Sequence, residues 1–474
     1  MGPRVLMTTE GTYPYAQGGV STWCDLLVRG LRDVDWQILP LMTGRLHRRH
    51  QCPDWVRVLP TIEIWSGPPR GVQPVAGRRA GDRTSLPGEL AAEILGWNGD
   101  IDALRDTLIW CRQNPGRVRA VFRARRGWES FVLALESLLA EQPPGVGDVP
   151  DLLLSNASTL YHCLYWVAQT AAVPTPASDV LVVTAAGWAA IPAIVHSALH
   201  GTPLVLVEHG VYVREAYLGA TKTDPANRFV ATRIARGLTR AAYASADIVV
   251  PVTEANAAWE EALGVPRERI HPIPNGVEAG RDPHPAPWAT RVVSLGRIDP
   301  LKDLHTLLRV AAEVTRQLPE TEFQHFGTDW PPTDAYGRSC LALHEELQLG
   351  SRFRFMGWTP APKMALRDSN LCLMTSISEA FPMSILEAMS EARPVVATGV
   401  GGIPHVVKGC GYLAPPGDVH SLATGVVTLL RNPDLAGYLG MRGYMRLSRK
   451  YGQATSLGQY HQILLELSGG KPAA

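Results

Sequence analysis

Net charge is almost absent from this sequence. Lysine and arginine number 45 and the acidic residues 44, which leaves a formal charge of +1 at neutral pH. A balanced chain has no electrostatic reason to keep nucleic acid or an anionic membrane as an obligatory partner. The seven cysteines are scattered, odd in number and free of any C-x-x-C spacing. They favour reduced thiols in a cytosol over a disulfide framework or a zinc site.

Long uninterrupted apolar segments are also lacking. Two tracts, 152–178 and 180–200, contain no Asp, Glu, Lys or Arg and are long enough to span a membrane. The first carries polar residues such as Asn156 and Gln169, and the second is broken by Gly187 and Pro192. We therefore predict a strand at Val180–Val183 and a helix at Trp188–Leu199 instead of a span. The first residues, MGPRVLMTTEG, contain too short an apolar stretch for a signal peptide, so a cytoplasmic location is expected.

Length and composition predict two globular domains. A chain of 474 residues with 46% hydrophobic and 19% charged residues exceeds what one typical core holds. The proline-rich segment 281–287 suggests a linker, with the boundary near residue 285. Basic and Pro/Gly-rich pieces between residues 43 and 150 suggest an insertion in the first domain.

The most informative stretch is LCLMTSISEAFPMSILEAMSEARPVVATGVGGIPH, residues 371–405. Its pattern predicts a buried strand at Leu371–Met374, a helix that begins near Pro382 and a strand at 394–397. A helix N-terminus at the carboxyl edge of a parallel sheet suits a phosphate. Glu379 and Glu387 flank that point, and carboxylates beside a phosphate are tolerated when sugar hydroxyl groups of the same ligand donate to them. The spacing therefore suggests a nucleotide sugar.

Three other places offer groups to such a ligand. Arg297 and Lys302 follow a predicted strand at Val292–Leu295, and two cations there can neutralise a diphosphate. Gly18 and Gly19 follow the first strand, Arg4–Thr8, and can let the backbone approach a ligand, with Ser21 as the predicted N-cap of the next helix. His209 lies just beyond the carboxyl end of the predicted strand Leu204–Val207, a position suited to ligand contact.

These motifs together resemble glycosyltransferase family 4, a family of retaining enzymes. The resemblance lies in E-x7-E at Glu379 and Glu387, G-R-x4-K at Arg297 and Lys302, and I-P-N-G-V at 273–277. It implies an α/β GT-B fold, with two Rossmann-like domains facing each other across a cleft. The implied domains are an N-terminal acceptor-side domain, 1–285, with its insertion around 43–150, a nucleotide-sugar-binding domain, 286–452, and a C-terminal helix, 453–474, that crosses back.

The resemblance also implies residue roles. His209 and Glu379 would contact the donor sugar, and Glu387 the ribose. Arg297, Lys302 and the backbone amides of Met383 and Ser384 would hold the diphosphate, which Gly18 and Gly19 face from the first domain. Gly357 would lie near the base. Starch and glycogen synthases, a related class, place a lysine where this sequence has Ala16, which argues against an ADP-glucose synthase.

Within the family, EGTYPYAQGGVSTW, LVEHGVYVRE and GRIDPLKD look similar to the PelF group of bacterial exopolysaccharide glycosyltransferases. This implies transfer of glucose from UDP-glucose, with no cofactor and no metal, to a glycan or glycolipid acceptor. It also implies a cytoplasmic protein, with the inner face of the membrane and a membrane-bound synthase complex as further expectations. The sequence departs from the group at Ala380, where glycine is usual.

Two alternatives remain open at this point. Gly399-Val400-Gly401-Gly402 after a strand suggests a nicotinamide-dependent dehydrogenase, but Pro404 stands where the third glycine is needed. The second alternative is a catalytically silent GT-B protein that binds a nucleotide sugar and acts as a scaffold. D-x-D patterns, which could bind a metal, occur at Asp33–Asp35 and Asp100–Asp102, away from the other motifs.

Overall fold

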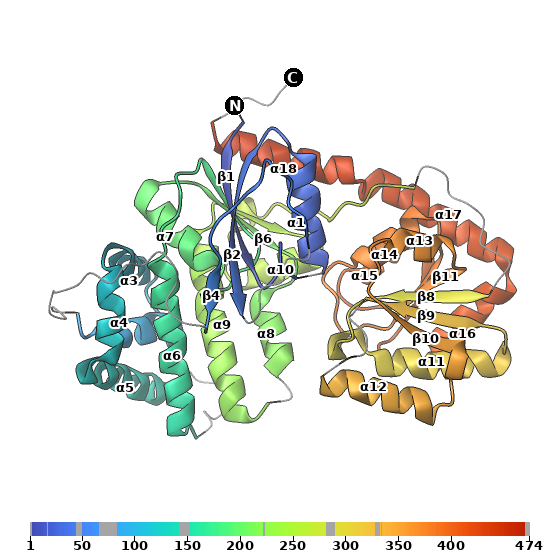
Figure 1. Cartoon of the computed structure of the whole chain (residues 1–474), viewed down its shortest axis with the longest axis horizontal. Helices are drawn as coiled ribbons and strands as arrows, with labels where there is room; N and C mark the ends of the chain where they lie inside the picture. The colour runs from blue at the N-terminus through green and yellow to red at the C-terminus, as the bar shows by residue number, and fades with distance from the viewer. Residues whose placement is uncertain are drawn as a thin grey trace. The chain divides into compact units, whose positions relative to one another are not determined.

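The computed structural model describes residues 2–16, 18–43, 50–65, 83–141, 151–220, 223–280, 290–327, 332 and 334–469. The described residues form two compact units. The first lies within Met1–Val252, Asn256–Pro272 and His461–Ala474, and the second within Thr253–Ala255 and Ile273–Tyr460. Each unit contains a parallel sheet covered by helices (Figure 1). The predicted α/β class with two Rossmann-like domains is confirmed.

The sheet of the first unit has seven strands among the described residues. Its order is β3-β2-β1-β5-β6-β7, with β4 paired to β2, and every printed pairing is parallel. The strands are β1 (Arg4–Glu10), β2 (Asp35–Thr43), β3 (Arg57–Val58), β4 (Ile62–Ile64), β5 (Val180–Val183), β6 (Leu204–Glu208) and β7 (Ile248–Pro251). β5 and β6 are fully buried aliphatic runs, as central parallel strands are.

The helices of the first unit fall into two groups. One covers the sheet: α1 (Gly19–Gly30), α7 (Ala190–His200), α8 (Tyr212–Ala220), α9 (Pro225–Ser245) and α10 (Glu254–Ala262), whose first two residues group with the second unit. The other group contains α2 (Leu86–Leu90), the π-helical turn η1 (Ala91–Leu95), α3 (Ile101–Gln113), α4 (Pro115–Arg123), α5 (Arg125–Ala140) and α6 (Leu154–Ala171). A short turn, η2 (Arg267–Arg269), follows α10.

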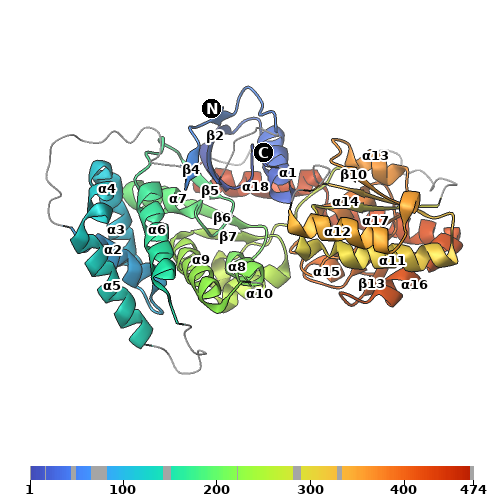
Figure 2. The same cartoon turned by 60° about the horizontal axis from the view of Figure 1, so that its bottom comes forward.

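Helices α3 to α6 lie together in both views (Figures 1 and 2). Their apolar side chains share one core with the sheet, so the predicted insertion is part of the first unit and not a separate domain. Residues 44–49, 66–82 and 142–150 of that insertion lie outside the described residues. The charge-poor tracts become α6, β5 and α7. None of the helices in the described ranges combines the length and hydropathy needed to cross a membrane.

The sheet of the second unit has six described strands in the order β10-β9-β8-β11-β12-β13, also parallel. They are β8 (Arg291–Leu295), β9 (Glu322–Phe326), β10 (Phe353–Gly357), β11 (Leu371–Met374), β12 (Val395–Thr398) and β13 (Gly411–Ala414). The order reverses beside β8, because β9 lies on one side of it and β11 on the other. Ligands of open α/β sheets bind outside the carboxyl ends of the strands at such a switch point.

Helices cover both faces of this sheet, with α11, α12 and α16 on one side and α13, α14 and α17 on the other (Figure 1). The helices and turns are η3 (Pro300–Lys302), α11 (Leu304–Gln317), α12 (Ala335–Glu346), η4 (Gly350–Arg352), α13 (Pro362–Arg367), α14 (Met383–Ser390), α15 (Ile403–Val407), α16 (Val419–Arg431), α17 (Pro433–Lys450) and α18 (Gln453–Leu467). The core of this unit is separate from that of the first.

The division between the units falls after Pro272, ahead of the boundary near residue 285 that the sequence suggested. Hydrogen bonds tie the intervening residues to the second unit: Val277 N donates to Tyr451 O at 2.9 Å, and Gly280 N to Ser390 O at 3.0 Å. The proposed linker, 281–287, lies outside the described residues. At the other end of the chain, α18 groups with the first unit from His461 onward, and His461 bonds to Asp33 at 2.7 Å.

Candidate functional site

The turn between β11 and α14 has the features of an anion site. β11 buries all four residues, and α14 begins at Met383 directly after Pro382, as predicted. In the described part of the chain, no side chain forms a capping hydrogen bond with this helix. The amides of Met383 and Ser384 lie in the first turn, where N–H groups have no acceptor within the helix. These donors and the helix dipole favour a negatively charged ligand.

An ion pair between Lys302 and Glu379 lies beside this turn. Both side chains are mostly buried, and they come from η3 and from the loop before α14. The two loops are joined by further bonds, since Ile377 N donates to Leu301 O at 2.8 Å and Thr375 Oγ1 to Lys302 O at 3.1 Å. The fold thus brings together two predicted site residues that are 77 positions apart.

A second loop supports the backbone of Glu379 from the other side. Gly402 N donates to the carbonyl oxygen of Glu379 at 3.2 Å. Gly401, with φ of +53°, lies so close that a Cβ atom there would stand 1.6 Å from the same oxygen. The G-x-G-G stretch therefore serves to pack one backbone against another, a physical reason for its glycines that needs no nicotinamide cofactor.

Glycine residues end three neighbouring strands at the same edge of the sheet. Gly296 N donates to Phe326 O and Gly327 N to Gly357 O, both at 2.9 Å. A Cβ atom on Gly327 would stand 2.2 Å from Gly296 O, and its φ is +144°. The sequence reasoning selected Gly357 but missed Gly327, although a glycine directly after the predicted strand Phe323–Phe326 was the available signal. Because Gly296, Gly327 and Gly357 have no side chains, a ligand can approach the backbone closely at this edge of the sheet.

Arg297 is not part of the buried pair. Its side chain is 65% exposed, and its ion-pair partner is Asp299, at 3.6 Å. Asp299 also accepts a hydrogen bond from Leu301 N at 2.9 Å, which caps η3. Arg297 therefore lies at the exposed side of the loop that carries Lys302.

Glu387 lies one turn inside α14 and is partly buried. Burial raises its pKa to about 7, and the Lys363 cation offsets part of this rise. No hydrogen bond of its carboxyl group is present within the described residues. A carboxylate in this position can accept hydrogen bonds from a ligand with two hydroxyl groups.

In the first unit, Gly18, Gly19 and His209 are linked through Trp23. α1 begins at Gly19 with Gly18 as its N-cap, so the prediction that Ser21 caps the helix was wrong. The Ser21 hydroxyl group is instead buried in the first turn, and no described residue forms a hydrogen bond with it. Trp23, on this helix, contacts the His209 ring edge-on, with centroids 4.6 Å apart.

His209 follows β6 as predicted, and both of its ring nitrogens are buried and have no hydrogen-bond partner among the residues that the structure describes. Burial lowers the pKa of His209 to about 3, so the imidazole is neutral at physiological pH. A neutral ring can donate one hydrogen bond and accept another.

The sequence reasoning missed a buried carboxyl network beside His209. Glu208 accepts hydrogen bonds from Tyr243 Oη at 2.5 Å and from Tyr212 N at 3.2 Å. Glu260 is completely buried nearby, and its carboxyl group interacts with that of Glu208. Burial raises the pKa of both carboxyl groups, and their mutual repulsion raises the pKa of Glu260 further. The network fixes the end of β6 and thereby the start of the His209 loop.

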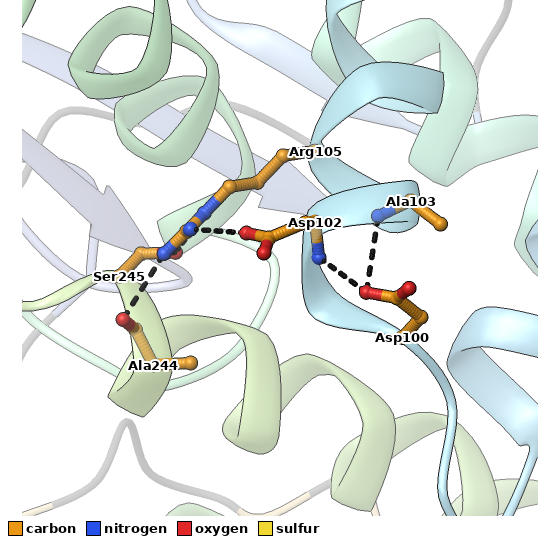
Figure 3. A network of polar contacts seen from close by, with 6 residues as sticks. All are labelled: Asp100, Asp102, Ala103, Arg105, Ala244 and Ser245. Carbon is orange, nitrogen blue, oxygen red and sulfur yellow. Dashed lines mark hydrogen bonds and ion pairs between the residues drawn. The ribbon is translucent and has the colours of Figure 1, made fainter.

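Figure 3 shows what one D-x-D pattern does. Asp100 caps α3 by accepting hydrogen bonds from Asp102 N at 2.8 Å and Ala103 N at 3.3 Å. Asp102 pairs with Arg105 at 2.8 Å, and Arg105 also donates to Ala244 O at 3.1 Å. Both carboxylates therefore have structural roles: Asp100 caps α3, and Asp102 orients Arg105, which joins α3 to the end of α9.

Comparison with known proteins gives two family matches. Residues 3–268 match the model described as "Domain of unknown function (DUF3492)", and residues 289–432 match "Glycosyl transferases group 1". Among curated relatives, a putative colanic acid biosynthesis glycosyltransferase, WcaL of Escherichia coli K12, is 31% identical over 193 residues, which are 37% of this chain and 46% of that protein. The chain spans less than half the length of the first curated relatives that it matches.

Two solved structures match nearly the whole chain. The sucrose-phosphate synthase of Thermosynechococcus elongatus has a TM-score of 0.62 at 19% identity, covering 99% of this chain and 100% of its own. HepE of Anabaena, in complex with UDP and glucose, has a TM-score of 0.61 at 16% identity, and the match covers 98% of this chain and 99% of HepE. At these identities the likeness establishes the GT-B fold. Because a single model covers more than half of its length, the chain belongs to the DUF3492 family, followed by a group 1 glycosyl transferase domain.

Proposed function

We propose that this protein is a retaining hexosyltransferase that moves glucose from UDP-glucose to an acceptor hydroxyl group in exopolysaccharide or cell-surface glycan synthesis, as the PelF group does. The observation that carries the proposal is the mostly buried Lys302–Glu379 ion pair beside the uncapped N-terminus of α14. A cation and free amides suit a diphosphate, and the carboxylate suits a sugar. The matches to a group 1 model, to WcaL and to HepE in complex with UDP-glucose support this choice.

In the proposed reaction, an acceptor oxygen forms a bond to the anomeric carbon on the face from which UDP departs. The bond between that carbon and the diphosphate oxygen breaks, and UDP keeps the electron pair. A donor phosphate oxygen takes the acceptor proton, so no protein nucleophile is required. Lys302, Arg297 and the α14 N-terminus would stabilise the charge that develops on the diphosphate.

The remaining roles follow the same proposal. Glu379 and the neutral His209 would bind the donor sugar, Glu387 the ribose, and Gly18 and Gly19 would face the diphosphate. Gly357 would lie near the base, next to the exposed Trp358. No metal or cofactor is included in this reaction.

The test is calorimetric titration of the purified protein with UDP, ADP and GDP, repeated on Arg297→Ala and Glu387→Ala. We expect selective UDP binding that each substitution weakens by about tenfold or more, because hydrogen bonds to charged groups are worth about 1.5–3 kcal/mol. Arg354→Ala is the matched control, since Arg354 lies in the same sheet and pairs with Glu322 at 3.0 Å, outside the proposed site. It should bind UDP like the wild type.

Absence of binding to every nucleotide by a folded wild-type protein would contradict the enzyme and the nucleotide-sugar scaffold alike. UDP binding without hydrolysis or transfer from any UDP-sugar would support the catalytically silent scaffold instead. Turnover of UDP-glucose, with retention at the anomeric carbon established by nuclear magnetic resonance of the product, would establish the proposed activity.

A further inference from the structure

Helix α17 exposes a stripe of large apolar side chains. Leu435, Tyr438, Met441 and Met445 are between 40% and 58% exposed. Their spacings of three, three and four residues place them on one side of the helix. We call this side, together with the cations described below, the outer face of α17.

The packing of the helix does not require this stripe. The opposite side buries Ala436, Gly440, Gly443 and Leu447. Gly440 lies so close to the chain before β12 that a Cβ atom there would stand 2.0 Å from Ala392 O. α17 is thus anchored through small residues, and its large apolar side chains point away from the core.

The charges around the stripe are mainly positive. Arg442, Arg446, Arg449 and Lys450 lie on the same helix, and Asp434, in its first turn, is the single acidic residue of α17. Within the described ranges, none of these four cations forms an ion pair with an acidic side chain. Arg446 donates instead to the carbonyl oxygens of Val406 at 2.9 Å and His405 at 2.6 Å, which leaves Arg442, Arg449 and Lys450 as the cations of the outer face. Arg442 stacks on Tyr438, 5.6 Å from the ring centroid, and donates to its hydroxyl group at 3.1 Å. The cation and the apolar surface are therefore one continuous feature.

This combination selects its partner by chemistry. A soluble anionic polymer would satisfy the cations but would leave the apolar side chains in water. A second copy of the same face would bring like charges together. An anionic bilayer accepts both, because apolar side chains enter the boundary between head groups and acyl chains while Arg and Lys remain at the lipid phosphates.

We propose that the outer face of α17 binds the surface of an anionic lipid bilayer. The helix lies on the membrane and does not span it. The face is on the unit that carries Lys302 and Glu379, so binding would hold that unit at the surface where lipid-linked acceptors are found. The inference does not depend on the proposed transferase activity.

The experiment is sedimentation of the full chain with vesicles, at fixed salt, using phosphatidylcholine alone or mixed with phosphatidylglycerol. We expect binding to the anionic vesicles only. Arg449→Glu with Lys450→Glu should weaken it by more than about tenfold, since each cation near an anionic surface contributes about fivefold. Met441→Ser with Met445→Ser should also weaken binding, through the loss of apolar insertion.

Two matched controls lie on α5 of the first unit. Leu133→Ser removes a leucine that is 67% exposed but is flanked on its helix by Glu129 and Glu136. Arg126→Glu reverses an exposed cation of the basic stretch 117–126. Both should sediment like the wild type. UDP titration and thermal unfolding of every variant establish that the fold and the nucleotide site are intact.

Three sedimentation results would overturn the proposal: no sedimentation with anionic vesicles, equal sedimentation of the α17 variants and the wild type, or loss of binding in Arg126→Glu alone. A change of oligomeric state in the methionine variant, measured by light scattering, would assign the face to contact between copies. Since vesicle binding is measured without nucleotide, its failure is distinguishable from failure of the transferase proposal.

Discussion

Glu387 is the residue whose chemistry can be tested most directly. Its pKa of about 7 means that the carboxyl group is half protonated near neutral pH when no ligand is bound. The ionised form accepts hydrogen bonds from both ribose hydroxyl groups through two charged oxygens, and such bonds are stronger than those to the protonated form. UDP binding therefore favours ionisation, and by linkage ionisation favours UDP binding. The affinity should fall as the pH drops below about 7 and should level off above it.

Glu387→Gln tests this prediction, because glutamine cannot ionise. Calorimetric UDP titrations from about pH 6 to about pH 9 should show a wild-type affinity that is about tenfold lower at the acidic end, one unit below the pKa. The variant should bind more weakly at high pH, with a flatter profile. The terminal phosphate of UDP also ionises in this pH range. The pH dependence of affinity in Glu387→Gln therefore measures the contribution of UDP alone. If UDP affinity depends on pH in the same way in both proteins, Glu387 does not bind the ribose.

Individual residues differ in how far sequence could predict them. Glu379 and Glu387 follow from spacing, since a strand and a helix N-terminus locate both. The Lys302–Glu379 pair was predicted as two separate residues, and their contact appears only when two loops meet across the sheet edge. Glu208 and Glu260 could not be predicted as a pair, because nothing in the local pattern indicates that both would be buried side by side.

At the scale of elements, short apolar runs were the reliable signals. β5 and β11 have the predicted bounds, because a central parallel strand is a continuous aliphatic run. The predicted start of α1 was wrong. Serine is a residue type that often caps helices, but Ser21 is buried in the first turn of α1. Glycines whose role is contact between backbones, such as Gly401, resemble ordinary turn residues until the facing strand is known.

Gly401 provides a prediction about the loop that supports Glu379. In Gly401→Ala, the new Cβ atom would overlap the Glu379 carbonyl oxygen, so the loop must shift. We expect destabilisation of about 2–4 kcal/mol, of which about 1–2 arises from the positive φ alone. UDP binding should weaken as well, because Lys302 loses its positioned partner. Urea unfolding and calorimetric titration measure the two effects.

Gly350→Ala is the matched control. Gly350 has the same φ of +53°, but a Cβ atom there meets nothing within 4 Å. This variant should lose only the part due to backbone strain and should keep wild-type UDP affinity. If both variants lose equal stability and neither loses affinity, the contact with Glu379 has no role in the site.

At the scale of the whole molecule, the two units have separate hydrophobic cores, one within each sheet and its helices. Separate cores favour separate cooperative unfolding transitions. The residues proposed to hold the nucleotide ribose and diphosphate lie mainly in the second unit. Ligand binding stabilises the folded state that binds it by mass action. UDP should therefore act mainly on one of the two transitions.

Differential scanning calorimetry can test this. UDP at about one hundred times its dissociation constant should stabilise the second unit by about 2.7 kcal/mol, a rise of roughly 5–10 °C in one transition. Uridine is the control, since it lacks the diphosphate that Lys302 and the α14 N-terminus are proposed to bind, and it should shift that transition much less. The other transition should stay in place. A single transition would show that the units unfold together, and equal shifts with UDP and uridine would show that the diphosphate contacts do not contribute, which would remove the main support for the proposed site.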